Sequence, residues 1–296
     1  MRNIGHFEQA DLRVTDLGAA SDFFINVMGL EEISRDENAT YLGCGYDNNV
    51  DLTLVKGGTG VQRFTLRTGD GDDLDWATHR LSDAGVEHEL LTDAAPGQTN
   101  SLRFTLPEGH DMELVTVQDN RYREAYRQQP ARHGVTPIDG DHINLISSDR
   151  RALGQFMCDV LGARVSDLIV DEESGEWLNC WIRTSHVHHD VAAFPLRAKG
   201  QSLHHYAFEY ASLEHMAAAL DAIAAAGHKI ELGVSRHPVG ANFYAYMWTP
   251  GGNRIELSCG GSEVPAAAEP RVWRGLQDTL DAWADPIIPG TFTEGS

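Results

Sequence analysis

The chain has little positive charge. It carries 23 lysine and arginine residues against 44 aspartate and glutamate residues, and its formal net charge is -21. A protein that binds nucleic acid needs a basic surface that displaces the counterions of the phosphates. The sequence therefore predicts no nucleic-acid partner, and the charge indicates solubility rather than a particular fold.

Long apolar runs and paired cysteines are also missing. No run approaches the ~20 apolar residues of a membrane-spanning helix, and the N-terminus MRNIGHFEQADLR has no hydrophobic signal-peptide region. The four cysteines, Cys44, Cys158, Cys180 and Cys259, show no C-x-x-C spacing. We expect no membrane association and a cytoplasmic protein with free thiols.

What the chain does contain is an internal duplication. DLRVTDLGAASDFFINVMGL, from residue 11, matches NLISSDRRALGQFMCDVLGA, from residue 144, and PEGHDMELV matches PGGNRIELS later in each half. In both halves, alternation, helix starts and turns predict a strand, a helix and three strands, twice over. We expect an α+β protein with a first domain at 1–120, a polar linker at 121–137, a second domain at 138–261 and a tail at 262–296.

The most informative stretch is a hairpin in the second domain. Asn242–Trp248 and Arg254–Cys259 are predicted strands joined by a turn at TPGGN. Alternation places Glu256 on the polar face of its strand, Tyr246 lies across the hairpin, and His237 comes nine residues before Tyr246. A carboxylate, a phenol and an imidazole that converge on one hairpin indicate a functional site.

Two further strands each offer one metal-binding side chain on the less apolar face. In GDHINLISSD this is His142. In SLHHYAFEY, His204 shares its face with aromatic residues that should pack against a helix, so His205 is the better ligand. With Glu256 these residues make a set of two imidazoles and one carboxylate, which leaves three coordination positions open and is typical of non-heme Fe(II) oxygenases.

The alternative for each histidine is a surface or satisfied core position, which is the commoner fate of a single histidine on a strand. The duplication favours the metal set, because only one half has it. At the positions paired with His142 and His205 the first half has Gln9 and Arg63, and only Glu113 keeps the residue type of its partner. We expect the first domain to be a scaffold.

These motifs resemble those of the vicinal oxygen chelate superfamily, and within it the two-domain type I extradiol catechol dioxygenases of the homoprotocatechuate type. The resemblance rests on GDHINLISSD, on LHHYAF, on W-x7-HDVA from Trp181 to Ala192, and on the spacing H-x8-Y-x9-E that ends at Glu256, and it covers nearly the whole chain. It implies that each domain consists of two βαβββ modules in an open, partly closed mixed β-barrel. It also implies an enzyme that inserts both atoms of O2 into a catechol beside the diol.

The resemblance implies a role for each residue in the motifs. His142, His205 and Glu256 would bind Fe(II), and Mn(II) fits the same ligands. His189 is implied as the acid–base residue, and His237 and Tyr246 are implied as contacts of the substrate oxygens.

Three further residues are implied in the oxygen and substrate pocket: Asn144, Trp181 and Leu232. Leu232 stands where the homoprotocatechuate branch has an arginine for the substrate's carboxylate. A carboxylated catechol is therefore expected only if Arg236, Arg271 or Arg274 substitutes. The resemblance also implies a homo-oligomer, commonly a tetramer.

Two segments carry simpler expectations. In SHVHHD, His186 and His188 are expected to face solvent. In the tail, Val272–Ala284 has the apolar spacing of a short amphipathic helix. We expect this helix to pack on the barrel or on a neighbouring subunit, and a lid over the active site is the alternative.

Two other functions compete with the dioxygenase. A Lewis-acid isomerase or glyoxalase-like lyase of the same superfamily would need a fourth protein ligand or a different base, and it has no use for His237 and Tyr246. A metal-free ligand-binding protein would have lost the ligands in both halves, whereas the second half keeps all three.

Overall fold

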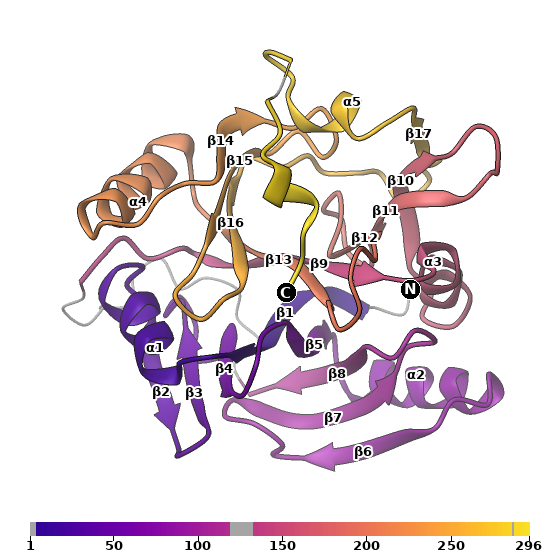
Figure 1. Cartoon of the computed structure of the whole chain (residues 1–296). Coiled ribbons are helices and arrows are strands. Elements are labelled where there is room, and N and C mark those ends of the chain that lie inside the picture. Colours follow the sequence, from indigo (N-terminus) through magenta and orange to yellow (C-terminus); the bar gives the residue numbers. More distant parts are fainter. Residues whose placement is uncertain (1–3, 119–132, 286) are drawn as a thin grey trace.

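The computed structural model of the chain describes residues 4–118, 133–285 and 287–296. Figure 1 shows the N-terminal half below and the C-terminal half above, each built on its own sheet. Most of the predicted linker, residues 121–132, lies outside the described residues.

The N-terminal half repeats one order of elements, a strand, a helix and three strands. The first module comprises β1 (Ile4–Val14), α1 (Leu17–Asn26), β2 (Glu31–Arg35), β3 (Ala39–Gly43) and β4 (Leu52–Lys56). The second comprises β5 (Val61–Thr68), α2 (Gly71–Asp83), β6 (His88–Thr92), β7 (Gln98–Thr105) and β8 (Asp111–Val117).

The C-terminal half has the same order. Its first module comprises β9 (Asp139–Ser147), α3 (Arg150–Asp159), β10 (Arg164–Val170), β11 (Trp177–Arg183) and β12 (Val191–Pro195). Its second comprises β13 (Leu203–Glu209), α4 (Leu213–Ala225), β14 (Leu232–Arg236), β15 (Phe243–Trp248) and β16 (Arg254–Cys259). The predicted four βαβββ modules and the α+β class are confirmed.

Strand order confirms that the two halves are copies of one architecture. The first sheet runs β6-β7-β8-β5-β1-β4-β3-β2, and the second runs β14-β15-β16-β13-β9-β12-β11-β10 in the corresponding positions. Both are mixed sheets, with parallel pairs such as β5 with β8 and β13 with β16. The second sheet gains one further edge strand, β17 (Arg271–Trp273), from the tail.

Helix starts match between the halves because the same capping chemistry recurs. The carboxylate of Asp16 accepts a hydrogen bond from the backbone N–H of Ala19 at the start of α1. Asp149 accepts one from Ala152 at the start of α3. Such caps satisfy amide groups that have no partner within the helix. The last helical residue of α1 is Asn26.

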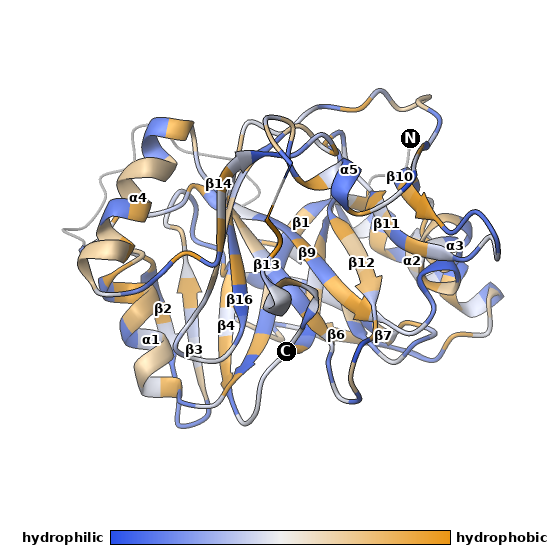
Figure 2. Ribbon diagram, turned by 45° about the horizontal axis from the view of Figure 1, so that its top comes forward, coloured by the Kyte–Doolittle hydropathy of each residue, from blue (hydrophilic) through white to orange (hydrophobic). Residues whose placement is uncertain are grey.

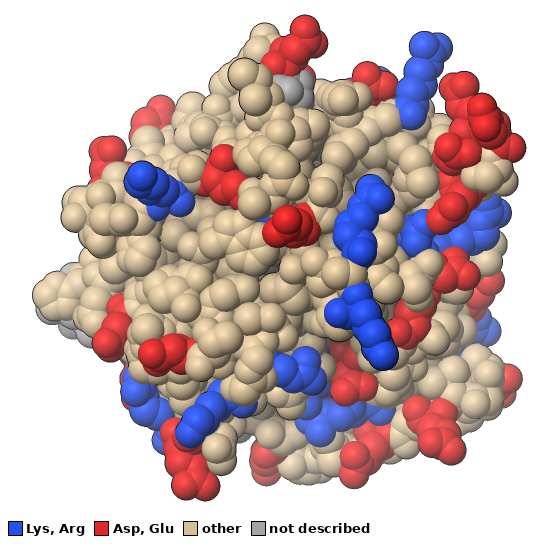
Figure 3. Space-filling model, viewed as in Figure 1, with Lys and Arg blue, Asp and Glu red and all other residues tan. Residues whose placement is uncertain are grey.

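The buried apolar residues form one main cluster that draws on both halves. Figure 2 shows many apolar residues along central strands such as β4 and β12. On the face in Figure 3, lysine and arginine side chains stand among aspartates and glutamates rather than in one basic field. Within the described part of the chain, no helix has both the length and the apolar character needed to cross a bilayer.

The tail does not form the predicted helix from Val272 to Ala284. Its start is the edge strand β17, which pairs in parallel with β10, and its helical part is only α5 (Gln277–Leu280). The indole N–H of Trp273 donates to a carboxylate oxygen of Asp167 at 2.6 Å. Strand pairing and this buried hydrogen bond outweigh the helical spacing of the apolar residues. A short 3-10 helix, η1 (Gly290–Thr293), follows near the end.

Candidate active site

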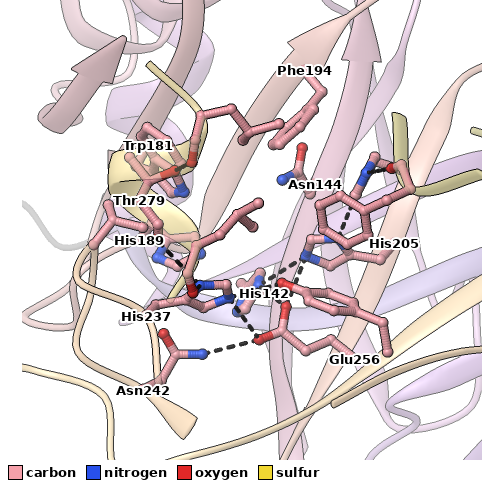
Figure 4. Close-up of a pocket in the computed structure, with 16 residues that line it drawn as sticks. His142, Asn144, Trp181, His189, Phe194, His205, His237, Asn242, Glu256 and Thr279 are labelled. Atoms are coloured by element: carbon pink, nitrogen blue, oxygen red, sulfur yellow. Dashed lines mark hydrogen bonds and ion pairs between the residues drawn. The ribbon is translucent and has the colours of Figure 1, made fainter. Parts of the chain in front are cut away.

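Three neighbouring strands bring the predicted metal ligands together. His142 lies on β9, His205 on β13 and Glu256 on β16, and β13 is paired with both of the others. Nε2 of His205 is 3.0 Å from Oε2 of Glu256 and 3.2 Å from Nε2 of His142. Nε2 of His142 is 3.4 Å from the same carboxylate oxygen. All three side chains are buried and point toward one another (Figure 4).

These separations suit a metal ion. Two ligand atoms that each lie about 2.1 Å from a metal are about 3.0 Å apart at a right angle and about 3.4 Å apart at a tetrahedral angle. The three observed distances fall in that range. In the described residues, this trio is the group of histidine, cysteine and acidic side chains whose ligand atoms converge closely enough to hold a metal.

The charges of the trio also suit a cation. Burial would raise the pKa of Glu256, but His142 and His205 outweigh burial and hold it well below the usual range. Burial also opposes charge on His142, yet Asp141 and Glu256 raise its pKa to about 10. Burial lowers the pKa of His205 to about 4. The site therefore keeps one positive charge, on His142, beside the carboxylate of Glu256. A bound cation would replace this proton and neutralise the carboxylate instead.

His237 and Tyr246 form a pair next to the trio. Nε2 of His237 is 2.9 Å from the Tyr246 hydroxyl, and Nδ1 is 2.9 Å from the backbone oxygen of Leu280. The carbonyl can only accept, so Nδ1 carries the proton and Nε2 accepts from the phenol. Burial lowers the pKa of His237, and burial together with Glu256 raises that of Tyr246 well above its usual value.

His189 lies against the trio from a third side. Its ring centre is 4.1 Å from that of His142, and its Nδ1 is 3.0 Å from Nδ1 of His188. Burial, followed by His142 and His188, lowers the pKa of His189 well below its usual value. The imidazole is therefore neutral and able to accept a proton.

His186 is exposed, as expected, but the prediction that His188 faces solvent is wrong. His188 is buried, and its Nε2 lies 3.4 Å from a carboxylate oxygen of Asp167. Three histidines in four positions looked like a solvated loop. Only His186 is exposed. His188 and His189 pack against each other, and His189 lies against His142.

The structure places all but one of the predicted site residues around one pocket. Asn144 and Trp181 are buried and line it with the residues already described. Leu232 lies outside the lining, opposite Tyr246 in the β14–β15 pair, and packs against the tail. The residue thus stands behind the phenol rather than in the pocket.

No arginine or lysine of the described chain is among the pocket's lining residues. Arg236 donates to the backbone oxygen of Ala241 and lies over the ring of Phe243. Arg271 and Arg274 are exposed on the tail. None of the three candidates for a carboxylate partner reaches the pocket.

Several lining residues were not predicted. Asn242 donates from Nδ2 to Oε1 of Glu256 at 2.9 Å and so fixes the carboxylate. It stands four residues before Tyr246, on the same face under strand alternation, which is a usable signal. The others are His204 and residues that are apolar or come from the tail: Phe194, Val239, Leu276, Thr279, Leu280 and Phe292.

Comparisons with known proteins agree with this geometry. A family model described as the Glyoxalase/Bleomycin resistance protein/Dioxygenase superfamily matches residues 140–257. The chain is 30% identical to metapyrocatechase 2 of Cupriavidus necator over 75% of this chain and 72% of that protein. It is 26% identical to a manganese-dependent 2,3-dihydroxybiphenyl 1,2-dioxygenase of Geobacillus genomosp. 3, over 97% and 96%. The structure of homoprotocatechuate 2,3-dioxygenase from Brevibacterium fuscum, in complex with 3,4-dihydroxyphenylacetate, superposes with a TM-score of 0.85 at 26% identity and covers 100% of this chain and 93% of that one.

Proposed function

The chain belongs to the extradiol ring-cleaving dioxygenases of the glyoxalase/bleomycin resistance protein/dioxygenase superfamily, and from this membership we propose which residues carry the reaction and on what substrate. The observation that supports the proposal most strongly is the convergence of His142, His205 and Glu256 beside three further titratable groups. No such set occurs at the corresponding positions of the first half, which have Gln9, Arg63 and Glu113.

His142, His205 and Glu256 hold a divalent metal in this proposal. Two imidazoles and one carboxylate are the ligand set of non-heme Fe(II) oxygenases, so we propose Fe(II), with Mn(II) as the alternative. A bound metal of this kind supplies adjacent sites for the diol and for O2 and allows electron density to pass between them. The protein's remaining task is to orient the diol and to move its protons.

His237 and Tyr246 receive the diol. Leu280 holds the Nδ1 proton of His237, so Nε2 keeps a lone pair that faces the phenol and the pocket. A catechol hydroxyl, whose pKa is near that of a phenol, can donate to this nitrogen or exchange its hydrogen bond with the Tyr246 hydroxyl. The pair therefore positions one edge of the diol and stabilises its ionised form.

His189 acts as the acid–base residue. Its pKa is held low by burial and by neighbouring imidazoles, so the residue enters the reaction neutral. It can then accept one proton and later return it to an oxygen atom of the ring-opened product. Trp181 and Phe194 keep the same space apolar and limit access of bulk water.

The substrate we propose is a catechol without a carboxylate. The lining is made of aromatic and aliphatic side chains around the titratable groups, and within the described residues it presents no lysine or arginine to a second anion. A buried, unpaired carboxylate would be costly there. Leu276, Leu280 and Phe292 of the tail close the pocket, and we propose that this tail is a lid.

Three further features complete the proposal. The domain boundaries are those predicted from the sequence, 1–120 and 138–261. A cytoplasmic location is supported by four free thiols. A homo-oligomer, a tetramer by family resemblance, is supported by exposed apolar residues such as Trp283 and Ile287.

Oxygen uptake by protein loaded anaerobically with Fe(II) tests the proposal. Catechol, alkyl catechols, aryl catechols and a carboxylated catechol are offered in turn, and a visible spectrum is recorded with each. We expect uptake with new yellow absorbance for the neutral catechols and little for the acid. Metal binding without oxygen uptake on any catechol would contradict the proposed substrate class.

A further inference from the structure

His204 lies directly behind the metal ligand His205. Its Nδ1 is 2.7 Å from Nδ1 of His205, and its Nε2 is 2.7 Å from the backbone oxygen of Phe292. Both histidines are buried, so neither contact competes with bulk water. The sequence indicated only a packing role for His204, on the face with Tyr206 and Phe208.

The protons in this chain of contacts can be assigned from the acceptors. The carbonyl of Phe292 has no proton to give, so Nε2 of His204 must carry one and donate it. A neutral imidazole carries only one proton, so Nδ1 of His204 is a lone pair. Nδ1 of His205 must therefore donate to it, which leaves Nε2 of His205, the atom that faces His142 and Glu256, as a lone pair.

The surroundings of His204 favour its neutral form. Its side chain is fully buried, and the permanently charged Arg254 lies beside it. Nη1 of Arg254 donates to the backbone oxygen of His204 at 3.1 Å, so this charge is close. A protonated His204 would have two donors and could not accept from His205.

The tail carbonyl is itself held in place by the strand that bears these histidines. After η1 the chain pairs with the start of β13, since the N–H of Ser296 donates to Leu203 and the N–H of Leu203 donates to Ser296, at 2.8 and 3.0 Å. The ring of Phe292 also lies edge-on to Tyr246, with centres 5.1 Å apart. The tail therefore has a fixed position relative to the ligand.

We propose that His204 is a positioning residue. Its Nε2 donates to the tail carbonyl of Phe292 and its Nδ1 accepts from His205, and together these hydrogen bonds fix the His205 tautomer whose Nε2 faces the metal. The inference rests on the proposed metal site. Outer hydrogen-bond partners of a ligating imidazole set its orientation and raise its basicity, and their loss typically weakens metal binding by about 10- to 100-fold.

The alternative is that His204 only fills space. Its ring stacks on Phe194, with centres 4.4 Å apart, and meets Phe292 edge-on. Two substitutions separate these roles. His204→Phe keeps an aromatic ring and loses both hydrogen bonds, whereas His204→Asn loses the ring but places an amide oxygen near the former Nδ1, where it can accept from His205.

The measurement is the dissociation constant of Mn(II) for the metal-free full chain, obtained by competition with a chelator, with thermal melting recorded for each variant. We expect His204→Asn to bind within a few-fold of the unaltered protein and His204→Phe to bind about 10-fold or more weakly. The melting temperatures should not follow that order. In the Co(II) form, the exchangeable Nδ1 proton of His205 should give a shifted NMR signal in the unaltered protein and in His204→Asn, and this signal should be lost in His204→Phe.

Equal affinity of the unaltered protein and His204→Phe would overturn the inference, as would weaker binding by His204→Asn than by His204→Phe. If His204→Phe does not fold, His204→Gln replaces it, because the longer amide reaches Phe292 but leaves His205 without its acceptor. Failure of the unaltered chain to bind one metal would instead overturn the proposed function, so the two failures are distinguishable.

Discussion

The two halves of the molecule have the same sheet topology but differ in what faces a buried glutamate. Glu113 on β8 lies opposite Thr65, which lies opposite Gln9, and Glu256 on β16 is related in the same way to Ala207 and His142. The register therefore confirms the pairing of Gln9, Arg63 and Glu113 with His142, His205 and Glu256.

The difference lies in how each carboxylate receives positive charge. Nε of Arg63 lies 3.2 Å from one oxygen of Glu113, and Nη2 of Arg103 lies 3.1 Å from the other. Arg63 also pairs with Asp11. Guanidinium groups are permanent cations, and they occupy the space beside the carboxylate that they neutralise. In the second half the corresponding strands carry His205 and Tyr246, which leave room for an exchangeable cation and a ligand.

The comparison teaches that one scaffold can keep its buried acid while changing its function. A built-in cation makes the acid of the first half structural. The second half has His205 and Tyr246 instead of these arginines, and in our proposal its acid, Glu256, is therefore a metal ligand.

The largest effect should come from removing the acid in each half separately. Glu256→Gln should lose metal and reduce turnover by about 1,000-fold or more, because a neutral amide is a poor ligand beside two imidazoles. Glu113→Gln should keep metal content and turnover per folded molecule, but lose about 3 kcal/mol of stability because two partly buried guanidinium groups lose an anionic partner. Metal analysis, oxygen uptake and urea unfolding are the measurements. Equal loss of metal in both variants would remove the contrast.

The next effect concerns the acid–base residue. In the register of β4 with β1 and of β12 with β9, His189 corresponds to Val50 of the first half. His189→Phe should bind metal normally and turn over about 100-fold more slowly, since a proton donor is lost. The control is His186→Phe, which changes an exposed imidazole three residues away and should leave turnover unchanged. Single-turnover kinetics would show the effect, and normal rates in His189→Phe would contradict the role.

A smaller effect is expected at a pair of carboxyl groups where the halves meet. Asp51, from the first half, is buried, and Asp139, the first residue of β9, is half-buried; the two carboxyl groups are hydrogen-bonded to each other. Burial, followed by Asp47, raises the pKa of Asp51 to about 7, and burial, followed by Asp51, raises that of Asp139 further. The folded chain thus holds a proton that the unfolded chain releases above pH 4.

The sign follows from linkage. Because the folded state binds more protons, this stabilisation is complete below the unfolded pKa and is lost as pH rises toward and beyond 7, by at most about 1.4 kcal/mol per pH unit. The free energy of unfolding, measured in urea between pH 5 and 8, should therefore fall more steeply for the unaltered chain than for Asp139→Asn. Parallel pH profiles would show that the pair does not share a proton.

The smallest effect is a change of metal stoichiometry. Gln9→His combined with Arg63→His should give the first half the ligand set of the second, beside Glu113. We expect metal content to rise from about one to about two ions per chain, with no gain in oxygen uptake, because Val50 and Arg103 still stand where the second half has His189 and Tyr246. The double variant in a Glu113→Gln background is the control. A stoichiometry that stays at one would show that more than the charge distinguishes the halves.

The sequence was sufficient to predict the modules, the duplication and the convergence of His142, His205 and Glu256. Alternation and register are local properties, and the copy in the first half supplied an internal alignment for Glu113 and Glu256. The tail was mispredicted because its apolar spacing is helical, whereas pairing with the free edge of β10 and the Trp273–Asp167 hydrogen bond decide its conformation. Tertiary contacts of that kind leave no periodic signal.

Two other features required coordinates for the same reason. His188 and His204 each directly precede a histidine with a proposed function, and alternation alone assigns them to the opposite face. Their hydrogen bonds to His189 and His205 depend on ring rotation and on carbonyl groups from distant segments. The spacing of residues along the sequence does not indicate these hydrogen bonds.

The central claim is that the second half alone holds the metal. Crystals of the full chain grown with Mn(II), and measured on both sides of the manganese absorption edge, test it most directly. We predict one anomalous peak per chain, bonded to His142, His205 and Glu256, and none near Glu113. A peak beside Glu113, or a metal bound away from the trio in active crystals, would contradict the account.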